Sequence, residues 1–297
     1  YYLKPRDFGY TNRSENVKAK KRTGTIIYHI LVCGFGLIML YPLFWMFMSS
    51  FKETNTIFTT ARSLIPDPFT TENYGNGWAG FAGVSFGTFF KNSLFVAILG
   101  TLGTLASCAC VAFGFARCQF RGKKILFGAM LASMMLPGQI LMVPQYLWYE
   151  KLGWVGSFAP LIVPFCFAIQ GFFVYLMMNF IQGIPRELDE AAKIDGCSYY
   201  GIFAKVILPL MSPALITGAI FSFMWRWDDF MSALLYIDDP SKYPVSLALK
   251  LFCDPGSSSD YGAMFAMATL SIIPIVLIFI FFQKYLADGI ATSGLKG

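Results

Sequence analysis

Residues 184–196 read IPRELDEAAKIDG, a short polar segment in a chain that is otherwise strongly apolar. Pro185 suits the first position of a helix, and three acidic side chains follow it in the first turns, where the helix dipole favours negative charge. Gly196 suits the position just after a helix, where a left-handed backbone is common. The segment therefore predicts a helix of about ten residues between Pro185 and Gly196.

Long apolar runs flank this segment on both sides. Of the 297 residues, 56% are hydrophobic and only 13% are charged, whereas soluble domains carry about 25% charged residues. Six stretches of 20 to 24 residues contain no Lys, Arg, Asp or Glu: 25–48, 94–116, 125–144, 158–181, 206–225 and 261–283. At about 1.5 Å per residue, each is roughly 30 Å long, the thickness of a bilayer's hydrocarbon core. The sequence predicts an all-α integral membrane protein with six transmembrane helices, kinked at internal prolines such as Pro137 and Pro164.

The distribution of basic residues predicts the orientation of these helices. If the N-terminus is cytoplasmic, the segments on its side hold 16 of the 23 Lys and Arg residues, and the opposite loops hold six. Because basic residues collect in cytoplasmic loops, both termini are expected in the cytoplasm. The predicted parts are a cytoplasmic N-terminal segment (1–24), a six-helix transmembrane domain (25–287) with an extracytoplasmic loop (49–93) and a cytoplasmic loop carrying the short helix (182–205), and a cytoplasmic C-terminal tail (288–297).

Two functions are open for the short cytoplasmic helix. Four residues at three- and four-residue spacing are expected to share one side of it: Leu188, Ala191, Ala192 and Asp195. One interpretation is an amphipathic helix on lipid headgroups, but such helices carry bulky apolar residues and a basic face. This helix has small alanines and more acids than bases. The composition therefore favours docking to another protein.

The spacing within and after this helix also carries a family resemblance. Glu190-Ala191-Ala192 is followed, after three intervening residues, by Gly196 and, after nine more residues, by Val206-Ile207-Leu208-Pro209. This resembles the EAA loop of bacterial ABC importer permeases, in which EAA and a glycine precede I-x-L-P; Val206 stands where that pattern has Ile. From the first span onward the chain resembles the sugar-importer branch, the family of the maltose permease, in five segments: SFKE (50–53), FTTENY (69–74), GFAR with FRG (114–122), DG (195–196) and GIATSGLKG (289–297).

The resemblance implies a type I ABC importer permease fold in the bacterial plasma (inner) membrane, with the EAA segment as the coupling helix. It implies a second, homologous permease subunit, two ABC ATPase subunits, an extracytoplasmic solute-binding protein and a sugar substrate. The ATPase-coupling residues carried over to this chain are Arg186, Glu190, Ala191, Ala192, Asp195 and Gly196. The GKK string at residues 122–124 lacks the upstream glycine of a nucleotide-binding loop, because Arg117 stands there. ATP and Mg²⁺ are thus expected on the partner ATPase chains, and no cofactor on this chain.

A second candidate region, WRWDD at residues 225–229, lies at the outer end of the fifth predicted span. Charged residues within a span are costly and usually face a cavity or a partner. In one interpretation Arg226 pairs with an Asp and stabilises the helix end. In the other, the region lines the substrate path, and Arg226 favours an anionic sugar such as a uronate; this set comprises Trp225, Arg226, Trp227, Asp228 and Asp229. The resembled family often has Trp-Asn-Asp/Glu-Phe here, from which Asp228 departs.

Other functions have weaker support in the sequence. An ABC permease for a non-sugar solute such as glycerol phosphate stays open, because the EAA loop does not specify the solute. A membrane-embedded enzyme requires clustered ionisable groups at membrane depth, and only the segment around Arg226 qualifies. A secondary transporter typically shows internal repeats or buried acids in several spans, which we do not find. The single histidine argues against a metal site, and the net charge of +6 is explained by the membrane rather than by nucleic acid.

Overall fold

The computed structural model describes residues 10–253 and 259–294, with the side chains of residues 25–253 and 259–284. The side chains of the predicted N-terminal segment and C-terminal tail lie outside these ranges. The longer helices are α1 (Tyr10–Ser49), α3 (Phe86–Arg117), α4 (Lys123–Met134), α5 (Gly138–Lys151), α7 (Gly171–Gly183), α11 (Ser212–Trp227) and α14 (Tyr261–Gly294). The shorter ones are α2 (Glu72–Ala79), α6 (Ala159–Ile162), η1 (Val163–Phe167), α8 (Glu187–Ile194), α9 (Tyr199–Ile202), η2 (Phe203–Ile207), α10 (Leu208–Leu210), α12 (Phe230–Tyr236), η3 (Pro240–Lys242) and α13 (Val245–Leu251).

The predicted all-α class is confirmed. The described residues form no strand, and their only β-type pairing is an isolated bridge between Phe81 and Val84. Four stretches are long and apolar enough to cross a membrane as single spans: Thr25–Ser49, Phe86–Arg117, Ala159–Gly183 and Tyr261–Lys284. Two bent pairs of helices raise the number in the described part of the chain to as many as six. The six predicted spans therefore correspond to four single stretches and two broken ones.

The third predicted span is broken rather than merely kinked. α4 ends at Met134, α5 begins at Gly138, and the two helices meet at 102°. Pro137 explains the break, because it has no N–H to donate and it disfavours helical backbone at the residue before it. Its own backbone is extended, with ψ at 127°, and it forms the N-cap of α5.

The fourth and fifth predicted spans are also interrupted. In the fourth, the 3₁₀ segment η1 contains Pro164 and ends against Ala168, whose φ of +53° is left-handed. In the fifth, the π-helical segment η2 and α10, which contains Pro209, precede a bend of 74°. α11 then begins at Ser212, six residues later than the predicted span. Irregular backbone at membrane depth is tolerated only where protein or a cavity surrounds it.

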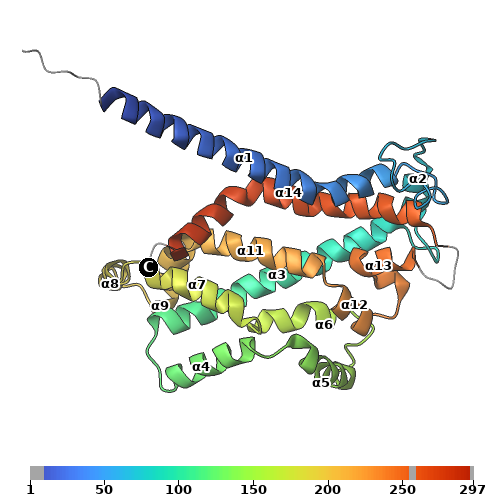
Figure 1. Cartoon of the computed structure of the whole chain (residues 1–297). Coiled ribbons are helices and arrows are strands. Elements are labelled where there is room, and N and C mark those ends of the chain that lie inside the picture. The colour runs from blue at the N-terminus through green and yellow to red at the C-terminus, as the bar shows by residue number, and fades with distance from the viewer. Residues whose placement is uncertain (1–9, 254–258, 295–297) are drawn as a thin grey trace, which may run out of the picture.

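α3 is the central helix of the bundle (Figure 1) and contacts α7, α11 and η1. It begins at Phe86, eight residues before the predicted span, so the predicted outer loop is shorter and contains α2. α1 lies along α14 at the edge of the molecule, and the apolar side chains of its predicted span are largely exposed. α4 and α5 form another edge and contain no buried residue.

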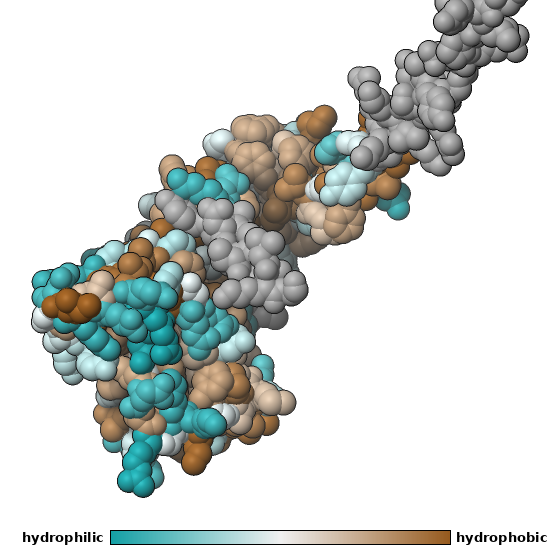
Figure 2. Space-filling model, turned by 90° about the vertical axis from the view of Figure 1, so that its left-hand side faces the viewer, coloured by the Kyte–Doolittle hydropathy of each residue, from teal (hydrophilic) through white to brown (hydrophobic). Residues whose placement is uncertain are grey.

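The bundle has two different ends. α8, α9 and the later part of α14 lie at one end, and α2, α12 and α13 lie at the other (Figure 1). α1 begins on the α8 side. Figure 2 views the α8 end, where hydrophilic residues gather on the surface between more hydrophobic flanks. This polar end contains the predicted docking helix.

Candidate functional site

α8 has the local structure that its sequence predicts, although it is two residues shorter. Arg186 is its N-cap, so Pro185 precedes the helix instead of starting it. Three acidic residues lie in its first turn and Lys193 in its last, an arrangement that complements the helix dipole. α8 is therefore a well-formed short helix in the connection between α7 and α9.

Gly196 closes the helix as predicted. Its φ is +80°, in the left-handed region. Its N–H donates to the carbonyl of Lys193 at 3.0 Å, and the N–H of Cys197 donates to the carbonyl of Ala192 at 2.9 Å. These two bonds form a Schellman motif, which satisfies carbonyls that a helix otherwise leaves unpaired.

A buried ion pair attaches α8 to the body of the protein. Nε of Arg117, the last residue of α3, lies 2.8 Å from Oδ2 of Asp189, and the two side chains are only 5% and 13% exposed. Nη2 of Arg117 donates a further hydrogen bond to the carbonyl of Ile184 at 2.7 Å. One guanidinium thus joins the end of α3 to the connection before α8 and to its first turn.

The two faces of α8 differ from the predicted arrangement. Asp189 and Ala192 are its buried residues, and Ala192 packs in the core cluster around α3 and α7. Ala192 therefore does not share an outer face with Leu188 and Ala191, which are exposed. The other predicted coupling residues are exposed: Arg186, Glu190, Ala191, Asp195 and Gly196. The exposed face of α8 is thus mostly polar. Ala192 instead packs α8 against the body of its own chain.

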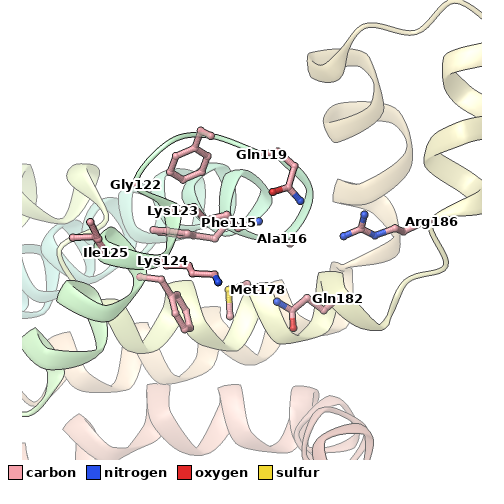
Figure 3. A pocket seen from close by; sticks show the side chains of 12 residues that line it. Phe115, Ala116, Gln119, Gly122, Lys123, Lys124, Ile125, Met178, Gln182 and Arg186 are labelled. Atoms are coloured by element: carbon pink, nitrogen blue, oxygen red, sulfur yellow. The ribbon is translucent and has the colours of Figure 1, made fainter.

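A pocket of about 740 Å³ lies beside the start of α8, between the α3–α4 connection and α7. Arg186 reaches toward it from the connection before α8, opposite Lys123 and Lys124 (Figure 3). Phe115 and Met178 contribute apolar surface. Arg186 is therefore placed between the exposed face of α8 and a hollow with a basic rim.

The second candidate region has a different arrangement from either sequence interpretation. Arg226 is only 7% exposed, and its guanidinium turns into the bundle. Nη1 donates to the carbonyl of Ser222 at 2.8 Å and also to its hydroxyl, while Nη2 donates to Oγ1 of Thr104 at 2.6 Å and to Oε1 of Gln170 at 3.3 Å. Cζ lies 3.9 Å from the centre of the Phe165 ring, a cation–π geometry. Arg226 therefore links α11 to α3 and to the interruption in the fourth span.

The interpretation that Arg226 pairs with an Asp is wrong, because no carboxylate of the described residues lies within ion-pair distance of it. Asp229 is instead the N-cap of α12, where Oδ1 accepts the N–H of Ser232 at 3.0 Å. Asp228 is exposed at the C-terminal end of α11. Gly100 on α3 makes room for the arginine, since a Cβ there would overlap the guanidinium.

The two tryptophans of this region have separate environments. Trp227 is buried, donates from Nε1 to the carbonyl of Ser271 at 3.0 Å, and stacks on Phe223. Trp225 is 46% exposed and packs against Phe172 and Phe173 of α7. The five residues 225–229 therefore do not converge on a common cavity.

Comparisons with known proteins agree with this architecture. The family described as "binding-protein-dependent transport system inner membrane component" matches residues 108–292. The arabinooligosaccharides transport system permease protein AraQ of Halalkalibacterium halodurans is 31% identical over 283 residues, which cover 94% of this chain and 100% of AraQ. The trehalose/maltose transport system permease protein MalG of Thermococcus litoralis is 31% identical over 277 residues, covering 93% and 98% of the two chains. The probable ABC transporter permease protein YurM of Bacillus subtilis is 35% identical over 257 residues, covering 86% and 84%.

A solved structure has the same fold. A chain of a bacterial ABC transporter that imports the acidic polysaccharide alginate superimposes with a TM-score of 0.78, covering 90% of this chain and 97% of its own. The two sequences are 24% identical. The predicted permease fold is therefore confirmed.

Proposed function

The chain belongs to the family of binding-protein-dependent transport system inner membrane components, and we propose that it forms half of the translocation pathway of an importer for a sugar or oligosaccharide. Two relatives that match nearly the whole chain are named for the transport of arabino-oligosaccharides and of trehalose and maltose. The proposed partners are a homologous permease subunit, two ABC ATPase subunits that bind ATP and Mg²⁺, and an extracytoplasmic solute-binding protein.

The observation that carries the coupling part of this proposal is the construction of α8. The helix exposes Glu190, Ala191 and Asp195, yet the Arg117–Asp189 ion pair and the cap at Gly196 fix its position on the bundle. A surface that is both exposed and rigidly attached can transmit the movement of a partner to the helices behind it. We propose that an ATPase subunit binds this face.

The proposed orientation places the α8 end in the cytoplasm. The start of α1 and the later part of α14 lie at this end of the bundle (Figure 1). The segments that the sequence predicts on the same side as the N-terminus hold 16 of the 23 basic residues. ATP binding to the partner subunits then favours one permease conformation over another. A shift of a few kcal/mol in that equilibrium is sufficient to change which side of the path is open.

Transport by the purified complex tests the cargo. The tagged chain is purified with its native partners, reconstituted in liposomes with the solute-binding protein, and offered labelled maltose, trehalose or arabinotriose. We expect uptake that needs ATP and is insensitive to an ionophore. Glycerol 3-phosphate tests the non-sugar alternative. Uptake of glycerol phosphate alone, or uptake driven by an ion gradient without ATP, would contradict the proposal.

Two variants test the coupling helix. Glu190→Lys reverses a charge on the exposed face, and Gly196→Trp places a bulky side chain at the helix end. Both are expected to reduce ATPase co-purification and uptake while membrane insertion stays normal. The matched control for ATPase co-purification is Glu53→Lys, which reverses an exposed charge after α1, at the opposite end of the bundle. Normal ATPase co-purification and normal uptake in both variants would overturn the docking role of α8.

A further inference from the structure

A second hollow, which we name the bend pocket, lies where two interruptions of the bundle meet the helix α12. Its volume is about 240 Å³. α5 contributes its first residues after the 102° bend, the 3₁₀ segment η1 contributes Pro164 and Phe165, and α12 contributes Ser232 and Tyr236. These elements lie toward the α2 end of the molecule (Figure 1). The breaks near Pro137 and Pro164, in the third and fourth predicted spans, therefore border one cavity.

Hydrogen-bonding side chains in this pocket are not used by the protein itself. Gln139, Gln145, Tyr149 and Tyr236 line it. Within the described ranges, none of these four side chains makes a hydrogen bond to another part of the chain. By contrast, Gln170 nearby is engaged by Arg226. Unpaired amides and phenols are costly to leave in hydrocarbon, so the pocket is expected to face water or a polar ligand rather than lipid acyl chains.

The elements around the pocket also indicate an internal path. α5 contains no buried residue, and its Gln139 and Gln145 are exposed in the isolated chain. Polar groups at membrane depth usually face a bundle interior or a water-filled cavity.

The chemistry of the lining selects the type of ligand. Amides and phenols offer both donors and acceptors, which suits hydroxyl groups. Tyr149 and Tyr236 lie 5.3 Å apart edge to face, and Tyr146 stacks on Tyr236, so the pocket has an aromatic wall. No charged side chain lines it. Arg226 lies against the Phe165 ring but is itself not part of the lining, so its charge is not presented to the cavity.

The size of the pocket limits how much of a ligand it holds. Pockets for drug-sized molecules measure roughly 300–1,000 Å³, and this one is smaller. We propose that the bend pocket binds one neutral sugar ring of the transported solute, with Gln139, Gln145, Tyr149 and Tyr236 hydrogen-bonding its hydroxyl groups. This inference rests on the proposed function, and it assigns the contact to residues other than the WRWDD segment.

Near-isosteric variants in the reconstituted transporter test the proposal. Gln145→Leu and Tyr236→Phe remove hydrogen-bonding groups but retain the size of the side chain. The maximal rate of ATP-dependent uptake of maltose, trehalose or arabinotriose is expected to fall about fivefold or more in each variant. ATP hydrolysis stimulated by the loaded solute-binding protein is expected to continue, because α8 is untouched. Gln283→Leu, an exposed residue of α14 outside the pocket, is the matched control.

The outcomes separate the two proposals. If the unmodified transporter carries none of the sugars, both the proposed function and this inference fail. If it carries a sugar, and Gln145→Leu and Tyr236→Phe both carry it at the unmodified rate, only the bend pocket assignment is overturned. Uptake of a uronate trisaccharide at the same rate as its neutral counterpart would overturn the preference for a neutral ring.

Discussion

Arg117 at the end of α3 and Asp189 in the first turn of α8 form an ion pair, with Nε and Oδ2 2.8 Å apart. The contact connects α3, the central helix of the bundle, with α8, the short helix exposed at its end. Arg117 also binds the carbonyl of Ile184, so the same side chain fixes the chain direction before α8. Movement of α8 is therefore expected to reach α3 without passing through a flexible loop.

Breaking this ion pair should loosen α8. Asp189→Asn keeps the shape of the side chain but leaves the Arg117 charge buried without a partner charge. Removing one member of a buried pair typically costs about 3–5 kcal/mol. We expect faster hydrogen exchange of the amides of residues 187–194 in the purified transporter and weaker ATPase retention.

The control for this variant is Glu187→Gln, which neutralises an exposed acid in the same turn and should leave both measurements unchanged. The double variant Arg117→Leu with Asp189→Leu removes both charges and should recover much of the exchange protection. Equal exchange rates in Asp189→Asn and the unmodified protein would show that the pair does not hold the helix.

The cap at Gly196 provides a second test of α8. A Cβ at this position meets nothing within 4 Å, so within this chain an alanine there acts only through the backbone. A non-glycine residue in a left-handed conformation costs roughly 1–2 kcal/mol. Gly196→Ala should therefore weaken α8 by about that amount, and Gly196→Asn by less, because Asn tolerates this conformation. Hydrogen exchange at the Cys197 amide measures the loss of the Schellman bond.

Gly183→Ala is the matched control, because that glycine also has open space around it but no positive φ. It should leave exchange at Cys197 unaltered. A result in which Ala and Asn at position 196 destabilise the helix equally would point to a side-chain effect rather than to backbone strain.

Arg226 is predicted to stabilise the bundle by hydrogen bonds to several helices. Its guanidinium bonds Ser222, Thr104 and Gln170 at once, an arrangement that a lysine ammonium cannot reproduce. Arg226→Lys keeps a buried charge but loses this geometry, whereas Arg226→Met removes the charge. Each unsatisfied buried partner costs roughly 1–3 kcal/mol. We expect both variants to lower the melting temperature of the complex in detergent. Arg226→Lys should melt at a lower temperature than Arg226→Met.

Lys91→Met, at an exposed position of α3, should leave the melting temperature nearly unchanged. If Arg226→Lys melts at the unmodified temperature, the planar network around the guanidinium is not what stabilises the bundle.

Local signals in the sequence were sufficient to predict the position of α8 and the cap at its end. The acids, Arg186 and Gly196 act within a few residues of one another, and the cap has the predicted form. The breaks in the spans were not predictable in this way, because proline has different effects in different helices. Pro42 and Pro274 lie inside continuous helices, whereas Pro137 lies at a 102° bend. Packing against neighbouring helices decides between these outcomes.

Sequence patterns also did not predict which polar groups pair across long distances in the chain. Asp189 was recognisable as an acid in a first helical turn, but its partner comes from the end of α3. Arg226 was recognisable as a costly charge, yet a pairing with the nearby aspartates was the simplest expectation. The structure instead satisfies it with Thr104, Ser222 and Gln170, uncharged groups from three parts of the chain. Only the tertiary arrangement brings them together.

The α2 end of the bundle, which the proposed orientation places outside the cytoplasm, offers a last test through Asn73 of α2. This buried amide donates to the carbonyl of Ser50 at 2.8 Å and to that of Lys52 at 2.7 Å. A Cβ on Gly262 of α14 would overlap its Oδ1, so the amide is tightly enclosed. Asn73→Asp has the same shape but replaces both donors with a charged acceptor facing two carbonyls. We expect a loss of about 2–5 kcal/mol from the buried polar groups left unpaired, seen as faster proteolysis between residues 49 and 73.

The same substitution at Asn76, which is exposed on α2, introduces an equal charge without removing a buried donor, so its proteolysis should match that of the unmodified protein. Because α8 lies at the opposite end of the bundle (Figure 1), ATPase co-purification should survive in Asn73→Asp. Binding of the solute-binding protein should weaken, because the proposed orientation places the α2 end on the extracytoplasmic side, where we expect that protein to dock. Loss of the ATPase with intact binding of the solute-binding protein would reverse the orientation that we propose for the chain.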